Sequence, residues 1–187
     1  MAKARDGRDR MLVAAGAAVA GLVAGVAVAS SKRVAVEAAD ALAGDWMDGL
    51  TAEHLEIIEA FDLIEAAKSA APSRRRKLAQ RLRAAIEKHA FQEETVVYPA
   101  ARAAGAEDAV SGLIVRQAEI KFQLYTLDRT PPDDPLWCKR VETLRRASER
   151  IIAEEEDVIF PLLRDHLDSK GAAELTALVY RTGAKLA

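Results

Sequence analysis

Residues 89–102 read HAFQEETVVYPAAR and residues 151–164 read IIAEEEDVIFPLLR, and the two stretches align without a gap. The alignment places Glu93 on Glu155, and in both copies an aromatic residue followed by proline comes five residues later. Glutamate, aromatic residue and proline at fixed spacing are too specific a combination to be a general property of helical sequence. This internal repeat decides how we interpret the rest of the chain.

A fainter repeat lies upstream of each stretch. Residues 54–57 read HLEI, and residues 117–120 read QAEI. Each copy therefore contains two segments in the same order. We predict two copies of one helix pair, related by a pseudo-twofold axis.

The composition agrees with a helical protein, because 39 of the 187 residues are alanine and only ten are glycine and six proline. Apolar residues recur at three-to-four spacing between chain breakers, and Ser73 and Asp134 are placed to cap two of the segments. The predicted fold class is all-α, an up-down-up-down antiparallel four-helix bundle over residues 45–187. We expect its helices at residues 45–69, 73–102, 107–128 and 134–167, with a short fifth at 169–186.

The first 33 residues do not belong to this bundle. Met11–Ser30 is a run of twenty uncharged residues, which as a helix spans about 30 Å, the thickness of a bilayer core. We expect one transmembrane helix within an anchor at residues 1–33, followed by a linker at residues 34–44. The predicted location is therefore a membrane, with a single-pass N-terminal anchor. Four basic residues before the run and two after it favour a cytoplasmic N-terminus.

The anchor has an alternative interpretation. Ala27-Val28-Ala29 has the small-x-small form that a signal peptidase accepts, so the segment is also compatible with a cleaved signal peptide. If it is retained, the glycines of Gly21-x-x-x-Gly25 would allow two anchors to approach closely and form a homo-oligomer.

Several function classes are excluded by residue content. A net charge of −2 gives no general attraction to nucleic acid. Cys138 is the only cysteine, which rules out an intrachain disulfide and cysteine-based metal sites. No Ser-His-Asp or Cys-His arrangement is present, so we expect a binding protein rather than an enzyme.

Polar residues interrupt the apolar face of every predicted long helix. Helical periodicity places His54, His89, Glu93, Gln117 and Glu155 among apolar residues that should face the interior. The same period places Val158 and Leu162 on the interior face of the fourth helix.

The two carboxylates are the informative members of this set. A buried, ionised carboxylate without a partner costs several kcal/mol, and no lysine or arginine shares these faces near Glu93 or Glu155. A bound cation would supply the missing positive charge. His89 and Glu93 are four residues apart, so both can contact one metal ion. The alternative is that the histidines are hydrogen-bonded core residues.

The chain resembles the hemerythrin-like, HHE cation-binding domain. The resemblance rests on four features spread over residues 45–167: His54, the run His89-x-x-x-Glu93 with its Tyr98-Pro99, residues 118–121 (AEIK), and residues 154–161 (EEEDVIFP). It implies an up-down four-helix bundle with a non-haem di-iron centre bridged by two carboxylates. It also implies binding of oxygen or nitric oxide, iron handling or redox sensing. The layout of anchor plus bundle resembles some bacterial members, which implies the bacterial inner membrane.

The departures from the family pattern change the expected metal content. By the resemblance, His54 and His89 match two ligands of one iron, and Glu93 and Glu155 match the bridging carboxylates. Gln117 and Ile151 occupy histidine positions of the other iron, and isoleucine cannot bind a metal. The third histidine, His166, is expected at a solvated helix end.

Two functions follow from this comparison. The first is a membrane-tethered domain holding a single iron, manganese or zinc ion through His54, His89, Glu93 and Glu155, for sensing, binding or storage. Oxygen and nitric oxide are its candidate ligands. The alternative is a metal-free structural or interaction module at the membrane.

Overall fold

The computed structural model describes residues 44–186, and every regular element in this range is helical. The predicted anchor at Met11–Ser30 and the linker lie outside the described residues. Within them, no helix is both long enough and apolar enough to cross a membrane. The elements are α2 (Trp46–Ala66), α3 (Pro72–Gln92), η1 (Glu93–Val97), α4 (Tyr98–Ala103), α5 (Glu107–Asp128), α6 (Trp137–Glu154), η2 (Glu155–Ile159), α7 (Phe160–His166) and α8 (Ser169–Gly183).

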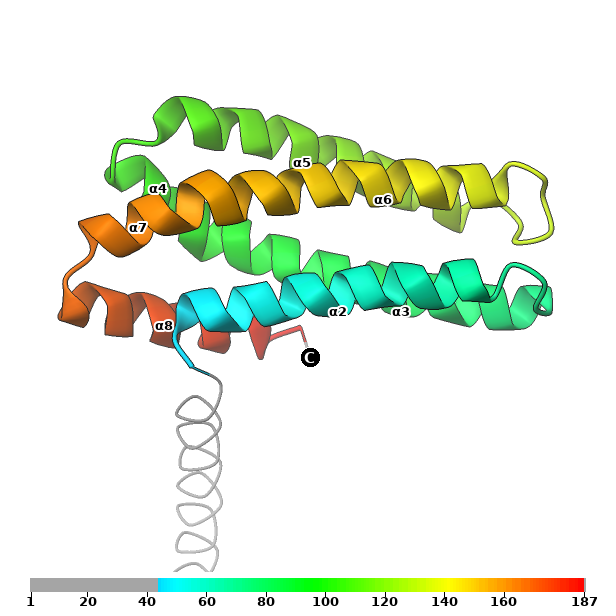
Figure 1. The fold of residues 1–187 in the computed structure, drawn as a ribbon, viewed down its shortest axis with the longest axis horizontal. Helices are drawn as coiled ribbons and strands as arrows, with labels where there is room; N and C mark the ends of the chain where they lie inside the picture. Colours follow the sequence, from blue (N-terminus) through cyan, green and yellow to red (C-terminus); the bar gives the residue numbers. More distant parts are fainter. Residues whose placement is uncertain (1–43, 187) are drawn as a thin grey trace, which may run out of the picture. The chain divides into compact units, whose positions relative to one another are not determined.

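These elements form four long rods and one short helix (Figure 1). One rod is α2, and the second runs through α3, η1 and α4. The third is α5, and the fourth runs through α6, η2 and α7. Consecutive rods are antiparallel, so the described residues form the predicted all-helical bundle. The short α8 packs against α2, α3 and η1 at the end of the bundle where α7 finishes.

The helix starts differ from the predicted ones at two positions. Ala71 is the N-cap of α3 and Pro72 occupies its first turn, so Ser73 lies inside the helix and does not cap it. Proline suits the first turn because the amide hydrogen it lacks would have no helical partner there. Asp134 accepts a hydrogen bond from the amide of Leu136 in a turn, and α6 begins only at Trp137.

Two π-helical turns interrupt the second and fourth rods at equivalent places. The turn η1 begins at Glu93 and η2 begins at Glu155, and each is followed by the aromatic-proline pair of the repeat. In both, the amide after the turn donates to the carbonyl five residues earlier, that of the glutamate. Proline has no amide hydrogen and its ring clashes with an α-helical carbonyl, so a wider turn before it relieves both problems.

The extra residue in η2 corrects the predicted interior face of the fourth rod. Val158 is 45% exposed, whereas Ile159 and Leu163 are fully buried. Simple helical periodicity, which assigned Val158 and Leu162 to the interior, therefore fails by one residue after Glu155. The same shift in the second rod buries Ala101.

The core runs the length of the bundle and is mostly aliphatic. A group of buried polar side chains interrupts it at one level of the bundle: His54, His89, Glu93 and Glu155. Side chains from all four rods that have no exposed surface include Leu50, Phe61, Leu82, Leu113, Leu144 and Leu163.

Candidate metal centre

Four predicted ligands from three rods meet in the core. His54 comes from the middle of α2 and His89 from the last turn of α3, while Glu93 and Glu155 open the two π-helical turns. All four are at most 5% exposed. One nitrogen or oxygen atom of each lies within 4.8 Å of the corresponding atoms of the other three. The structure therefore brings together every residue that the sequence predicted as a ligand.

The facing atoms of this cluster have no hydrogen-bond partner. They are Nε2 of His54, Nε2 of His89, Oε1 of Glu93 and Oε2 of Glu155. Nε2 of His89 is 3.1 Å from Oε1 of Glu93, and Nε2 of His54 is 3.4 Å from Oε2 of Glu155. Four unpaired polar atoms in one buried space are costly unless something binds them.

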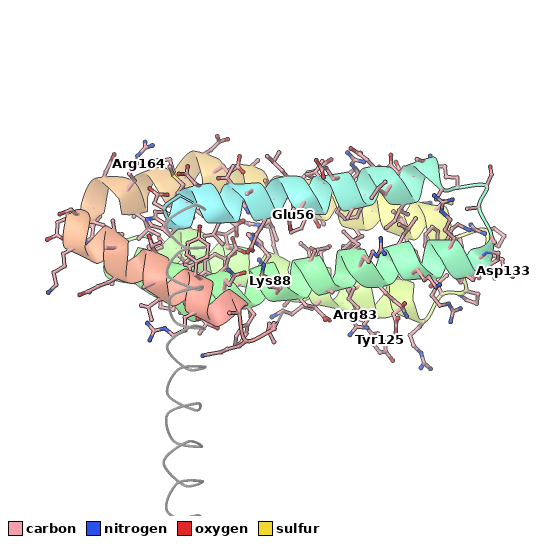
Figure 2. The ribbon with its side chains drawn as sticks, turned by 90° about the horizontal axis from the view of Figure 1, so that it is seen from below. Glu56, Arg83, Lys88, Tyr125, Asp133 and Arg164 are labelled. Carbon is pink, nitrogen blue, oxygen red and sulfur yellow. The ribbon has the colours of Figure 1, made fainter. Side chains whose placement is uncertain are left out.

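The other ring nitrogen of each histidine is held by a carboxylate. Nδ1 of His54 lies 2.7 Å from Oε1 of Glu156, and Nδ1 of His89 lies 3.0 Å from Oε2 of Glu53. Glu53 in turn pairs with Lys88, 2.9 Å away at the surface near α8 (Figure 2). A carboxylate behind each histidine fixes the ring orientation and turns Nε2 toward the centre, as it does in histidine-ligated metal sites.

The remaining oxygens of the two carboxylates are held by Gln117 and Tyr98. Nε2 of Gln117 donates to Oε2 of Glu93 over 2.9 Å, and the Tyr98 hydroxyl donates to Oε1 of Glu155. Gln117 also donates to the Tyr98 hydroxyl over 3.2 Å. This side of the centre is therefore filled by an amide and a phenol that bind each other.

The electrostatics of the metal-free site follow from these contacts. Burial lowers the pKa of a histidine, but the neighbouring carboxylates of Glu155 and Glu93 favour the protonated ring, outweigh burial and raise the pKa of His54 to about 9. The charge of Glu93 and a hydrogen bond with Glu53 outweigh burial to the same effect at His89, whose pKa rises to about 10. Without metal, both histidines are therefore protonated near neutral pH.

The two central carboxylates respond in opposite directions. Burial opposes ionisation of both. At Glu93 the nearby charges of His89 and His54 outweigh burial and lower the pKa. At Glu155 burial and the charge of Glu93 dominate and raise the pKa. Protons on His54 and His89 thus balance the negative charge that a metal ion would otherwise balance.

A small cavity adjoins the cluster. It has a volume of about 20 Å³, enough for one water-sized molecule, and its lining includes His89, Glu93 and Glu155. Most of the other lining residues are aliphatic. The exceptions are Gln117 and Ser148, and Ser148 is 4% exposed with an Oγ that has no hydrogen-bond partner.

The donor set fits a transition metal. Two imidazole nitrogens and two carboxylate oxygens suit zinc, iron or manganese. In each of the four side chains the other nitrogen or oxygen atom is held in place by a neighbouring residue. Ile151, buried beside the cavity, offers no ligand atom, and His166 is exposed at the end of α7. The sequence did not identify Glu53, Glu156 or Ser148 as part of the site. The available signal for the two carboxylates was their position beside predicted ligands, since Glu53 precedes His54 and Glu156 follows Glu155.

Comparison with known proteins agrees with this geometry. The Hemerythrin family, described as the hemerythrin HHE cation binding domain, matches residues 47–163, more than half of the chain. No curated protein and no solved structure gave a match to the chain. The matched range contains both copies of the repeat and all four clustered residues. On its sequence and on the geometry of this buried centre, the chain belongs to the hemerythrin HHE cation-binding family.

Proposed function

We propose that this protein is a membrane-tethered domain that holds one metal ion through His54, His89, Glu93 and Glu155, for sensing, binding or storage rather than catalysis. One observation carries the proposal. Each of the four side chains has its outer atom hydrogen-bonded by a neighbour, while its inner atom faces those of the other three across a common centre. A site shaped only by core packing has no reason to divide its polar atoms in this way.

The other side of the centre supports one ion rather than two. A second ion would need ligands at Gln117 and Ile151. Gln117 is already engaged with Glu93 and Tyr98, and Ile151 has no donor atom. We infer that the pair formed by Gln117 and Tyr98 replaces the second ion by hydrogen-bonding the free oxygens of the two carboxylates.

Iron, manganese and zinc are the metals that this donor set favours. The cavity beside the cluster would admit a single small ligand, which supports oxygen or nitric oxide as binding partners. The uncharged run Met11–Ser30 supports attachment to a bacterial inner membrane, and its glycine pair supports a homo-oligomer.

The direct test is the metal content of the full chain, purified in detergent without added metal and again after incubation with ferrous iron. We expect one transition-metal ion per chain, and none bound after His54→Ala or Glu93→Ala. His166→Ala is the matched control, because this histidine is exposed and distant in sequence from the cluster. Two ions per chain in the unmodified protein would contradict the single-ion proposal.

A second candidate function is a metal-free module. It is supported by the raised histidine pKa values, because two protonated histidines can neutralise both buried carboxylates without a metal. Under this function, the unmodified chain would contain no metal even after incubation with iron, manganese and zinc in turn. Its melting temperature would be unchanged by all three.

The carboxylates behind the histidines should control metal affinity. We expect Glu53→Gln and Glu156→Gln each to weaken zinc binding about 10- to 100-fold, because both fix a ring orientation and increase its basicity. Glu56→Gln is the control, since Glu56 is exposed and lies on α2, the helix that also carries Glu53 (Figure 2). Competition titration against a chromogenic chelator measures the effect. Equal losses in all three variants would show that only surface charge matters.

The cavity should control access of small ligands. Ser148→Val fills part of the space, so we expect it to abolish nitric oxide binding to the iron-loaded protein while leaving one iron per chain. Ser148→Ala keeps the space but removes the hydroxyl, and we expect a loss of about five- to tenfold in nitric oxide affinity, the effect of one hydrogen bond. Unchanged nitric oxide affinity in Ser148→Val would place the ligand elsewhere.

A further inference from the structure

Positive charge is concentrated in one segment of the bundle. Residues 66–86 contain seven lysines and arginines and no aspartate or glutamate. The remaining described residues carry 14 basic and 25 acidic side chains, so the rest of the bundle has a net negative charge. We call the seven side chains the basic tip; they are Lys68, Arg74, Arg75, Arg76, Lys77, Arg81 and Arg83.

Most of the basic tip is exposed and lacks an acidic partner. Arg83 pairs with Glu87 and Asp128, and the guanidinium of Arg75 lies over the ring of Trp137. The other five are exposed, and none makes an ion pair within the described part of the chain. Elsewhere on the surface, basic residues such as Arg145 and Lys121 are paired with carboxylates.

The basic residues at the start of α3 lower the stability of that helix. The N-terminus of a helix carries partial positive charge, which acidic residues stabilise and basic residues destabilise. The start of α3 has no acidic residue in its first turn and no side-chain cap. By contrast, α2 is capped by Asp45 and α8 by Asp168. A local arrangement that opposes helix stability indicates that the charges serve another purpose.

Most of the basic tip, from Lys68 to Lys77, lies at one end of the bundle, whereas Arg83 lies further along α3 (Figure 2). The α2–α3 connection and the α5–α6 connection share this end, while α8 lies at the other (Figure 1). Asp133, labelled at the tip in Figure 2, belongs to the second connection. Lys139 adds a further exposed cation there without an ion pair in the described residues. The result is a positive end formed by helix ends and connections.

We propose that the basic tip binds the surface of a bilayer rich in anionic phospholipid. Several exposed, unpaired lysines and arginines in one segment are the composition that anionic headgroups attract, and each contributes separately. A lipid surface fits better than nucleic acid, because the protein has a net charge of −2 and the ring under Arg75, that of Trp137, is 2% exposed and cannot stack on a base. The inference goes beyond the proposed function, since it needs no metal.

The single cysteine provides the measurement. Cys138 is exposed and lies at the same end, in the first turn of α6. The full chain, labelled at Cys138 with a fluorescent donor, is reconstituted into vesicles carrying a headgroup acceptor, so that the predicted anchor is inserted in every vesicle. The vesicles are phosphatidylcholine alone or phosphatidylcholine with phosphatidylglycerol. We expect stronger energy transfer with phosphatidylglycerol than with phosphatidylcholine alone, and loss of this excess between about 0.1 M and 1 M salt, where the screening length falls from about 10 Å to 3 Å.

Charge reversal at the tip gives the decisive comparison. Arg74→Glu, Arg76→Glu and Lys77→Glu together should abolish the excess energy transfer in phosphatidylglycerol vesicles. The matched control reverses three exposed cations outside the basic tip, Arg164→Glu, Arg181→Glu and Lys185→Glu, with the same change in net charge.

The control should keep the energy transfer of the unmodified chain. Equal loss in both triple variants, or transfer that does not depend on phosphatidylglycerol, overturns the proposal. It is also overturned if the tip binds a labelled DNA duplex while ignoring phosphatidylglycerol vesicles. Metal content, measured in parallel, should be the same in all three proteins.

Discussion

Zinc affinity is expected to rise about 100-fold between pH 7 and pH 8. Without metal, His54 has a pKa of about 9 and His89 a pKa of about 10, so both rings carry a proton in this range. A metal ligand must be deprotonated, and each proton displaced on binding makes affinity rise tenfold per pH unit. Zinc serves as a redox-silent probe, and calorimetry in buffers of different ionisation enthalpy counts the protons. Release of fewer than about two protons per ion at pH 7 would contradict the assignment of both histidines.

The same pKa values set how the stability of the metal-free protein depends on pH. Both histidines have folded-state pKa values above the ordinary 6.5, so folding favours their protonated forms. Their contribution to the free energy of unfolding is complete below about pH 6.5 and is lost as pH rises through about 9 and 10. The melting temperature of the metal-free chain should therefore fall between pH 8 and pH 10. His166→Ala should behave like the unmodified chain, whereas His89→Ala should show a shallower fall.

The variant Gln117→His with Ile151→His is expected to hold a second metal ion. By the repeat, these positions correspond to His54 and His89, and the two carboxylates that would bridge the ions are already present. Ile151→His alone places an uncompensated polar group in the core, at a cost of about 1–3 kcal/mol. In the double variant, ferrous iron should recover part of this loss, because a ligand that binds only the folded state stabilises it.

Metal content and melting temperature with and without ferrous iron test this expectation. The Tyr98 hydroxyl donates to Glu155 and competes for the oxygen that the second ion needs. Adding Tyr98→Phe to the double variant should therefore strengthen the second site. The two single variants are controls and should hold one ion. If the double and triple variants also hold only one, the pseudo-twofold correspondence is wrong.

The fold could be predicted because its signals are local. Alanine content, apolar spacing and chain breakers gave the four rods and the short fifth helix. The errors lie where the backbone departs from regular α-helix. Regular helical periodicity places Val158 in the interior, but the π-helical turn adds one residue to the period and exposes this side chain. The sign of the turn in the sequence is the proline that follows an aromatic residue. Ser73 was assigned as a cap although the preceding proline already starts the helix.

The four clustered residues could be predicted because polar side chains on an apolar helical face stand out. Their supporting contacts could not. Glu53 reaches His89 across 36 positions of sequence, and Glu156 reaches His54 across 102. Such pairs depend on how two rods are rotated against each other, which periodicity within one helix does not determine. In the sequence Tyr98 is only part of a motif, whereas in the structure its hydroxyl donates to Glu155 and accepts from Gln117.

The two π-helical turns mark places where the two copies of the repeat are equivalent, because glutamate begins each turn and an aromatic-proline pair follows it. The copies differ beside the turns, where the first has His54 and His89 and the second has Gln117 and Ile151. Two identical helix pairs that met as separate chains would build a symmetric centre. Because both pairs belong to one chain, the two sides of this centre can differ in sequence, so that one side presents imidazole rings and the other an amide and an aliphatic side chain.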